Sequence, residues 1–208
     1  MSKNLQGQEI SKGTNLQGQE SPSATVRPPL AWSREEGGTM PHPLVDQLRF
    51  TRSEWVRAFE GVTPTEAERR FGPVNSIAWL IGHLAWHEQI NWLQRAQGRT
   101  LVPEVERFGF GEPGSAAMLD EVWRAWQAIT GAADPYLDTL TSERLLTHFE
   151  VNGVAHRESV GTTLRRLTYH YWYHLGESQA IRQLLGHTEL PVFVGDINRA
   201  PYRPETAP

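Results

Sequence analysis

The sequence predicts an all-α fold: a four-helix bundle with a small β-hairpin before its last helix and a disordered N-terminal tail. Four long segments repeat apolar residues at helical spacing. One Asn-Gly pair between two alternating segments is typical of a tight hairpin. The first 39 residues are polar, rich in Gly, Ser and Pro, and too poor in apolar residues to form a core. Four long helices with connectors favour a bundle.

We expect three regions along the chain. Residues 1–40 form the disordered tail, in which NLQGQE occurs at 4–9 and again at 15–20. Residues 41–190 form the bundle, and the Pro-rich residues 191–208 form a C-terminal coil that wraps it. Two alternatives for the tail stay open: it is a docking segment, or Met40 is the natural start and the preceding residues are an upstream extension.

The first helix is expected over 43–60, followed by a short helical turn. Thr63 precedes Pro64, which is the pattern of a cap residue followed by proline at the first helical position. The residues expected on one face of the first helix are Leu44, Leu48, Trp55 and Phe59.

The second helix is expected over 75–96 and is apolar almost all round, as befits an element buried among others. Asn75 or Ser76 caps it and Gly98 stops it. The segment 99–113, with two glycines and two prolines, is expected to be a loop.

A third helix is expected over 115–140, and a fourth over 160–186. The apolar face of the third helix comprises Leu119, Val122, Trp126, Ile129, Ala133 and Leu137. Between these helices lies the hairpin, with its turn at Asn152-Gly153.

The composition excludes some classes of function. The chain of 208 residues carries a formal charge of −4, so it lacks the basic character of a nucleic-acid-binding protein. Its longest apolar run, 76–86, is too short for a membrane span, so a cytoplasmic protein acting on a small molecule is expected. It has no cysteine, so any thiol chemistry needs a thiol from outside. Eight tryptophans in the chain, seven of them in the expected bundle, would leave aromatics exposed and suit a homodimer.

Histidines recur at one spacing on two helices. His170 and His174 are four residues apart, and so are His83 and His87. Positions i and i+4 of a helix share a face, one turn apart, so each pair can lean onto one ion. Eight histidines in 208 residues would give fewer than one such pair by chance.

Both pairs fall on inward arcs of their helices. His170 and His174 lie among Leu167, Ile181, Leu184 and Thr163, with Glu177 on the same arc. Buried charge is costly unless it is paired or bound to metal. Two readings remain: metal ligands, or core histidines hydrogen-bonded to carbonyls, tyrosines or Glu177. The other histidines, in loop, hairpin or helix-end positions, are expected to be solvated: His42, His148, His156 and His187.

The segments SIAWLIGHLAWHE and TLRRLTYHYWYHLGESQAIRQLLGH resemble the DinB-like (YfiT-like) superfamily of four-helix-bundle metalloproteins. The resemblance covers about 41–190 and implies a bundle with one long crossover. It also implies that His83, His170 and His174 are the metal ligands. Known activities in this superfamily include thiol-dependent S-transfer and maleylpyruvate isomerisation, with mycothiol or bacillithiol as the low-molecular-weight thiol.

Two residues depart from the family pattern. Glu177 stands where Gln is common, and could be an orienting carboxylate, a fourth ligand or a general base. His87 is outside the usual triad and could support the ligands or contact substrate. Both are the candidate catalytic residues.

Three imidazoles on a divalent ion leave an open position, as in catalytic sites. Zinc suits this set best, although nickel, iron and manganese also accept imidazole. The expected function is a metal-dependent thiol S-transferase or hydrolase. The alternative is a non-catalytic metal-binding or structural bundle that acts in a stress response.

Surrounding side chains would separate these functions. A pocket lined by Trp79, Trp86 and Tyr173 would favour an enzyme, whereas a filled core would favour the structural bundle. Arg166 and Arg182 are candidates to hold a carboxylate substrate or the thiol, although surface solvation is the commoner state of such residues.

Overall fold

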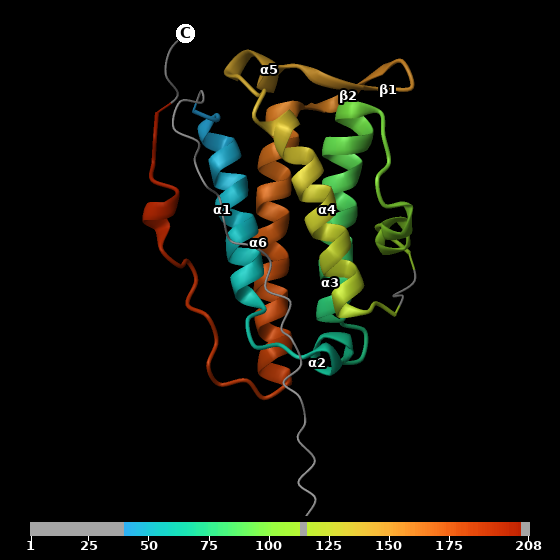
Figure 1. The fold of residues 1–208 in the computed structure, drawn as a ribbon, viewed down its shortest axis with the longest axis vertical. Coiled ribbons are helices and arrows are strands. Elements are labelled where there is room, and N and C mark those ends of the chain that lie inside the picture. Colours follow the sequence, from blue (N-terminus) through green and yellow to red (C-terminus); the bar gives the residue numbers. More distant parts are fainter. Residues whose placement is uncertain (1–39, 113–115, 205–208) are drawn as a thin grey trace, which may run out of the picture.

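The structure is a computed structural model that describes residues 40–112 and 116–204. Four long helices run side by side along the long axis of the molecule (Figure 1). They are α1 (Pro43–Ala58), α3 (Ile77–Glu88), α4 (Leu119–Leu137) and α6 (Val160–Leu184). The predicted four-helix bundle is therefore confirmed. The predicted disordered tail lies, apart from Met40, outside the described residues.

The helices follow an order with one long crossover. Chain colours in Figure 1 show that α1 and α6 run in one direction, and α3 and α4 in the other. Because α3 and α4 are parallel, residues 96–112 run back along the bundle toward the end at which α4 begins (Figure 1). Helix α3 packs against both α4 and α6, while α1 packs against α6. This places α3 and α6, the two histidine-bearing helices, in direct contact.

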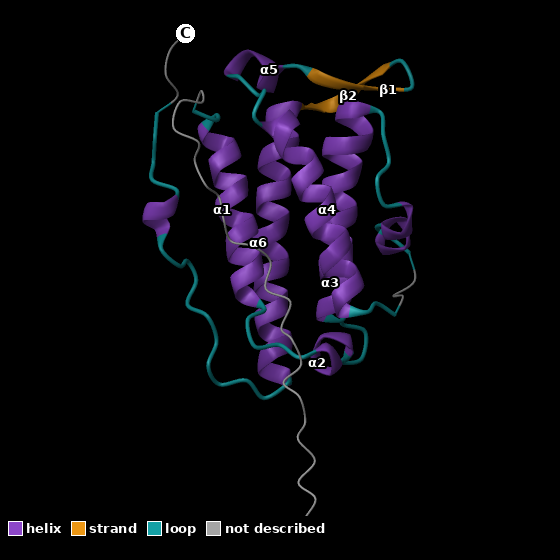
Figure 2. Cartoon of the chain, in the orientation of Figure 1, coloured by secondary structure: helices purple, strands orange, loops and turns teal. Residues whose placement is uncertain are grey.

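Shorter elements precede or follow the long helices along the chain (Figure 2). These are α2 (Pro64–Glu68), the π-helix η1 (Gln89–Arg95), the 3-10 helix η2 (Pro103–Phe108), α5 (Ser142–Leu146), β1 (His148–Val151), β2 (Val154–Ser159) and the 3-10 helix η3 (Ile197–Arg199). The expectation that 99–113 is entirely loop was wrong, because η2 forms there and packs against α3. Its Val105 and Phe108 are buried, which gives the segment an apolar anchor.

Helix starts follow the expected cap chemistry. Thr63 forms a reciprocal capping box with Glu66, and Ser76 accepts a hydrogen bond from the Trp79 amide at 3.2 Å. The third long helix begins at Leu119 rather than at residue 115. Met118 has extended backbone and no side-chain cap, so helical structure starts where the apolar face does.

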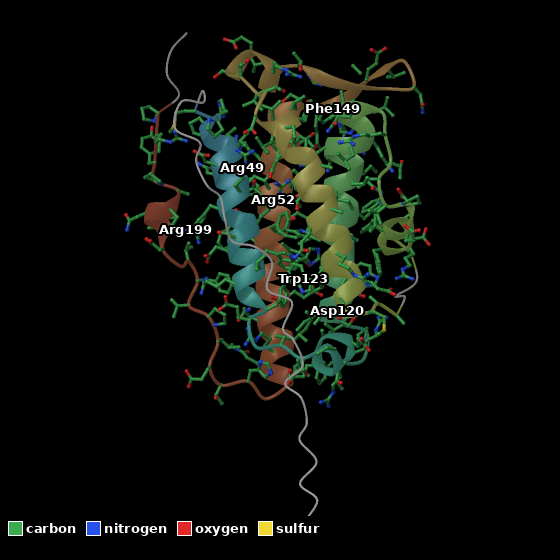
Figure 3. The ribbon with its side chains drawn as sticks, in the orientation of Figure 1. Arg49, Arg52, Asp120, Trp123, Phe149 and Arg199 are labelled. Atoms are coloured by element: carbon green, nitrogen blue, oxygen red, sulfur yellow. The ribbon has the colours of Figure 1, made fainter. Side chains whose placement is uncertain are left out.

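The core lies where the helical periodicity indicated. All six residues of the predicted α4 face are buried. Trp123 of α4 lies between helices, with its ring 6.0 Å from Phe59 and 5.5 Å from Trp126 (Figure 3). The predicted inward arc of α6 was wrong at Leu184, which is 57% exposed because the last turn extends past the bundle.

The hairpin covers one end of the bundle. Asn152 and Gly153 both have positive φ, 53° and 77°, as a type I′ turn requires. Val151 pairs with Val154 across the turn. Phe149 on β1 is buried, and its ring centroid lies 6.2 Å from that of Trp92 (Figure 3). The predicted hairpin is confirmed, and this one aromatic anchors it to the bundle.

The histidines expected to be solvated divide into three cases. His148 is exposed, as predicted, and His156 is half-buried. His42 is buried, because its Nδ1 accepts a hydrogen bond from the Leu44 amide and caps α1. His187 is half-buried, with Nε2 3.0 Å from the Glu66 carboxylate. Solvation was therefore the wrong prediction for His42.

Residues after α6 run back along α1 (Figure 1). The Arg57 guanidinium donates to the carbonyl of Val192 at 2.6 Å, and the Gly195 amide donates to Glu54 at 2.9 Å. Across the two described ranges, none of the helices combines the length and hydropathy that a membrane span needs.

Candidate metal centre

His83 of α3 is held between a hydrogen-bond partner and a stacked aromatic ring. It is 4% exposed, and its Nδ1 lies 2.6 Å from the carbonyl oxygen of Phe108 in η2. A carbonyl only accepts, so Nδ1 carries the proton and Nε2 has the free lone pair. The Trp79 ring stacks on the imidazole at 4.7 Å and 14°. The orientation of this ring is therefore fixed with its Nε2 available as a ligand.

Gly82 makes that arrangement possible. A Cβ at this position would lie 2.5 Å from the Phe108 ring, closer than any side chain tolerates. The absent side chain lets η2 approach α3, and this approach delivers the Phe108 carbonyl to His83. Sequence reasoning missed the contact, since it treated 99–113 as a loop.

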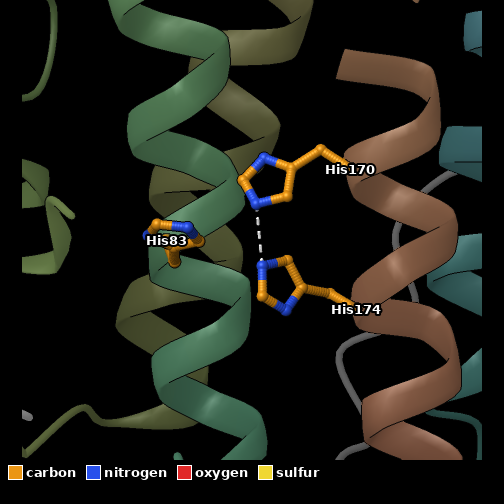
Figure 4. A group of neighbouring side chains, drawn as sticks. All are labelled: His83, His170 and His174. Carbon is orange, nitrogen blue, oxygen red and sulfur yellow. Dashed lines mark hydrogen bonds between the residues drawn. The ribbon is translucent and has the colours of Figure 1, made fainter. Parts of the chain in front are cut away.

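His170 and His174 point from α6 toward His83 (Figure 4). Their Nε2 atoms are 2.8 Å apart, as the i, i+4 spacing predicted. The Nδ1 of His174 donates to the Glu177 carboxylate at 2.7 Å, so its Nε2 accepts from His170. Glu177 thus lies behind His174, in the position of a carboxylate that orients a metal-ligating histidine.

The three side chains form a cluster of metal-binding size. One nitrogen from each of His83, His170 and His174 lies within 4.8 Å of the other two. Zinc–nitrogen bonds of about 2.0–2.1 Å require ligand nitrogens about 3–4 Å apart. Small rotations of the imidazoles would bring all three nitrogens to one ion. The donor set and the supporting Phe108 and Glu177 contacts therefore fit a divalent metal.

Burial lowers the pKa values of His83 and His170. It lowers the pKa of His83 to about 4, against the opposing effect of the Phe108 carbonyl. Burial, reinforced by the nearby His174, lowers the pKa of His170 to about 3. Neutral imidazole is the form that binds metal, so no proton has to be released near pH 7 for these two rings.

His87 lies beside the cluster without joining it. Its ring centroid is 4.2 Å from that of His170 and 4.8 Å from that of His83. Burial and the neighbouring His170 lower its pKa to about 2. It lines a cavity of about 730 Å³ together with His83, Phe110, Thr162, Arg165, Arg166, Tyr169, His170 and Tyr173. The three-histidine cluster therefore opens onto space large enough for a small molecule.

The predicted pocket residues are partly right. Tyr173 and Arg166 line the cavity, whereas Trp79 and Trp86 do not. Trp86 lies behind the site, where its Nε1 donates to Glu106 at 2.9 Å. Arg182, considered both as an anchor and as a solvated residue, is neither. It is 4% exposed and donates to the carbonyl of Ala58 and to His187.

A second polar cluster lies inside the bundle and was not predicted. Arg52 of α1 forms a bidentate pair with Glu88 of α3, at 2.8 and 2.6 Å, and also bonds Asp134 at 3.0 Å. The Tyr171 hydroxyl donates to Glu88 at 2.8 Å. The available signal was Glu88, the single carboxylate of α3. Glu88 and Tyr171 directly follow His87 and His170 in the sequence, so this cluster ties the two histidine-bearing helices together.

A comparison with known families identifies the chain. The family model described as the DinB superfamily matches residues 47–178. The chain belongs to the DinB superfamily. No curated protein matches it. The matched range of this DinB superfamily member contains all three clustered histidines and Glu177, and ends shortly after them.

Proposed function

We propose that this DinB superfamily protein is a metal-dependent enzyme whose divalent ion is held by His83, His170 and His174. The observation that carries the proposal is the cluster itself, three imidazole nitrogens within 4.8 Å at the wall of a 730 Å³ cavity. Zinc fits this all-nitrogen set best, and nickel, iron and manganese are the alternatives to test.

The ion would supply Lewis acidity, which lowers the pKa of a coordinated water or thiol. The remaining roles belong to the protein. Glu177 is a positioning residue, because its carboxylate holds the Nδ1 proton of His174 and does not line the cavity. His87 is the catalytic candidate, since its ring lines the cavity beside His170 and can hydrogen-bond a bound molecule.

Two reactions suit this arrangement. One is S-transfer, with a low-molecular-weight thiol of the mycothiol or bacillithiol type attacking an electrophilic small molecule. The other is hydrolysis, with water in place of the thiol. The chain has no cysteine, so the nucleophilic sulfur of the first reaction comes from the cosubstrate.

Elemental analysis of untagged protein purified without chelator tests the metal proposal. We expect about one divalent ion per chain in the wild type and little in His170→Ala. His148→Ala is the matched control, because that histidine is exposed on the hairpin and its loss should leave the metal content unchanged. Equal trace metal in the wild type and His170→Ala would overturn the proposal.

Glu177→Gln tests the positioning role. The amide cannot hold the Nδ1 proton of His174 as strongly as a carboxylate, so metal affinity should fall about 10- to 100-fold. Competition with a fluorescent zinc chelator measures the affinity. Glu189→Gln, outside the bundle, is the control for loss of one negative charge. An unchanged affinity in Glu177→Gln would contradict the role.

Activity assays on metal-loaded protein test the two reactions. Conjugation of mycothiol or bacillithiol to monochlorobimane reports S-transfer, and 4-nitrophenyl acetate reports hydrolysis. We expect His87→Ala to retain its metal but to lose whichever of the two activities is faster in the wild type. Acceleration of neither reaction by the loaded wild type would argue against both assignments.

A further inference from the structure

The cavity beside the histidine cluster is lined asymmetrically in charge. Arg165 and Arg166 of α6 line it, and none of the lining residues in 40–112 and 116–204 is a carboxylate. The wall of the cavity is therefore cationic before any metal binds, which favours an anionic occupant.

Helix α6 presents the lining residues in two adjacent rows. Thr162, Arg166 and His170 follow one another at i, i+4 spacing, and so do Arg165, Tyr169 and Tyr173. One helical step of four residues is about 6 Å along the axis. Arg166 therefore lies one helical turn before His170 in the same row.

The two arginines differ in how far they are neutralised. Arg166 donates to the Glu158 carboxylate from two nitrogens, at 2.8 and 2.5 Å. Arg165 donates to the Tyr169 hydroxyl at 3.1 Å, and forms no ion pair with any carboxylate in residues 40–112 and 116–204. Arg165 thus retains a full charge at the cavity wall. A guanidinium in this state is suited to a carboxylate, which it binds through two parallel hydrogen bonds.

The rest of the cavity wall offers aromatic surface. Phe110 is 90% exposed, Tyr173 72% and Tyr169 59%, although all three are large apolar side chains. They come from two different elements, the segment after η2 and the outer row of α6. Such exposure over a cavity is typical of a surface that packs against an apolar ligand.

We propose that the cavity binds a small organic carboxylate with an aromatic or apolar body. Its carboxylate is held by Arg165 and Arg166, and its body lies against Phe110, Tyr169 and Tyr173. The opposite end then faces His170 and His87. Only this last orientation rests on the proposed metal function; recognition of the carboxylate depends on α6 alone.

Isothermal titration calorimetry with 2-naphthoate and its neutral analogue 2-naphthylmethanol tests the proposal. The protein is treated with EDTA, so that binding does not depend on a metal. We expect naphthoate to bind at least about tenfold more tightly than the alcohol, because a charge-assisted hydrogen bond outweighs a neutral one. Arg165→Gln should abolish most of this preference and leave the affinity for the alcohol unchanged within about twofold.

Two controls isolate the arginines. Arg124→Gln removes an equivalent charge from α4, where the side chain is exposed and outside the cavity, and should preserve the preference. Arg166→Gln combined with Glu158→Gln removes both charges of that pair and should lower naphthoate affinity without a net change of charge. Far-UV circular dichroism establishes that each variant is folded.

Several outcomes would overturn the proposal. These are failure of naphthoate to bind, equal affinity for acid and alcohol, or an unchanged preference in Arg165→Gln. Sedimentation that shows a dimer closing over Phe110 and Tyr173, with no naphthoate bound, would assign the aromatic surface to self-association instead. Because the binding measurement uses EDTA-treated protein, a negative result leaves the metal proposal standing. Conversely, absence of metal in both the wild type and His170→Ala leaves the carboxylate proposal standing.

Discussion

Arg52 and Glu88 form an ion pair inside the bundle, and its disruption should be the most costly of the substitutions considered for this protein. Their side chains are 1% and 0% exposed. Burial alone would lower the pKa of Arg52, but the Glu88 carboxylate outweighs this and raises it above its usual range. The guanidinium therefore stays charged, and it continues to require a partner.

The perturbation is Arg52→Met, which keeps the apolar stem and removes the charge. Glu88 would lose both nitrogens of its bidentate partner and keep only the Tyr171 hydroxyl. A buried carboxylate left without its cation costs about 3–5 kcal/mol of folding free energy. Loss of the 3.0 Å contact to Asp134 adds little, since that carboxylate is partly exposed and also bonds Arg49.

Urea unfolding at pH 7, followed by tryptophan fluorescence, measures the free energy of unfolding. A second variant, Arg52→Met with Glu88→Leu, removes the orphaned charge and should be more stable than the single variant, because apolar replacements of buried ion pairs are often nearly neutral. Arg124→Met, an exposed arginine on α4, should change stability by less than about 0.5 kcal/mol.

Two results would refute this reasoning. A loss below about 1 kcal/mol in Arg52→Met would mean that Glu88 is not a buried, charged group that depends on its partner. A double variant less stable than the single would mean that the side chains contribute mainly by packing rather than by charge. Either result must come with an unchanged dependence of the unfolding free energy on urea, so that the folded and unfolded states remain comparable.

Two further predictions concern η2 and α2. Gly82→Ala places a Cβ 2.5 Å from the Phe108 ring and should destabilise the protein by about 1–3 kcal/mol in urea unfolding, offset in part by the helical preference of alanine. Gly131→Ala, whose Cβ would have nothing within 4 Å, is the control and should be neutral or stabilising. Equal effects of the two substitutions would contradict the contact with Phe108. For Glu66, hydrogen bonds from Thr63 and His187 lower the folded-state pKa to about 2, below the unfolded value of 4.5, so its stabilisation is present above pH 4.5 and is lost as pH falls toward 2. The melting temperature of the wild type should therefore exceed that of Glu66→Gln at pH 7, by an amount worth less than about 1 kcal/mol because the pair is partly exposed. The difference should close near pH 2, and a difference independent of pH would exclude the charge as its cause.

The features predicted correctly are those set by neighbours in the chain. Asn152-Gly153 forms the hairpin turn because both residues tolerate positive φ. Ser76 caps α3 because its side chain reaches an amide three residues on. The closeness of His170 and His174 likewise follows from helical geometry, in which the i and i+4 positions share a face.

The incorrect predictions concern residues whose environment is made by another element. Arg182 was expected at the surface or near a ligand, but the end of α1 supplies the Ala58 carbonyl that it bonds. His42 is the exception, since the contact found there is local: its Nδ1 accepts from the Leu44 amide, two residues on, and the side chain is buried. Periodicity along one helix cannot show what packs over its end.

The sequence by itself determined the helices, the hairpin and which histidines could share an ion, because these depend on spacings of a few residues. Only the tertiary structure decided that His83 meets His170 and His174, since this requires α3 to pack against α6. It also decided that a carbonyl from η2 orients His83, through the close approach that Gly82 allows. Such contacts join residues far apart in the chain, and their geometry is fixed by packing of side chains that no local pattern encodes.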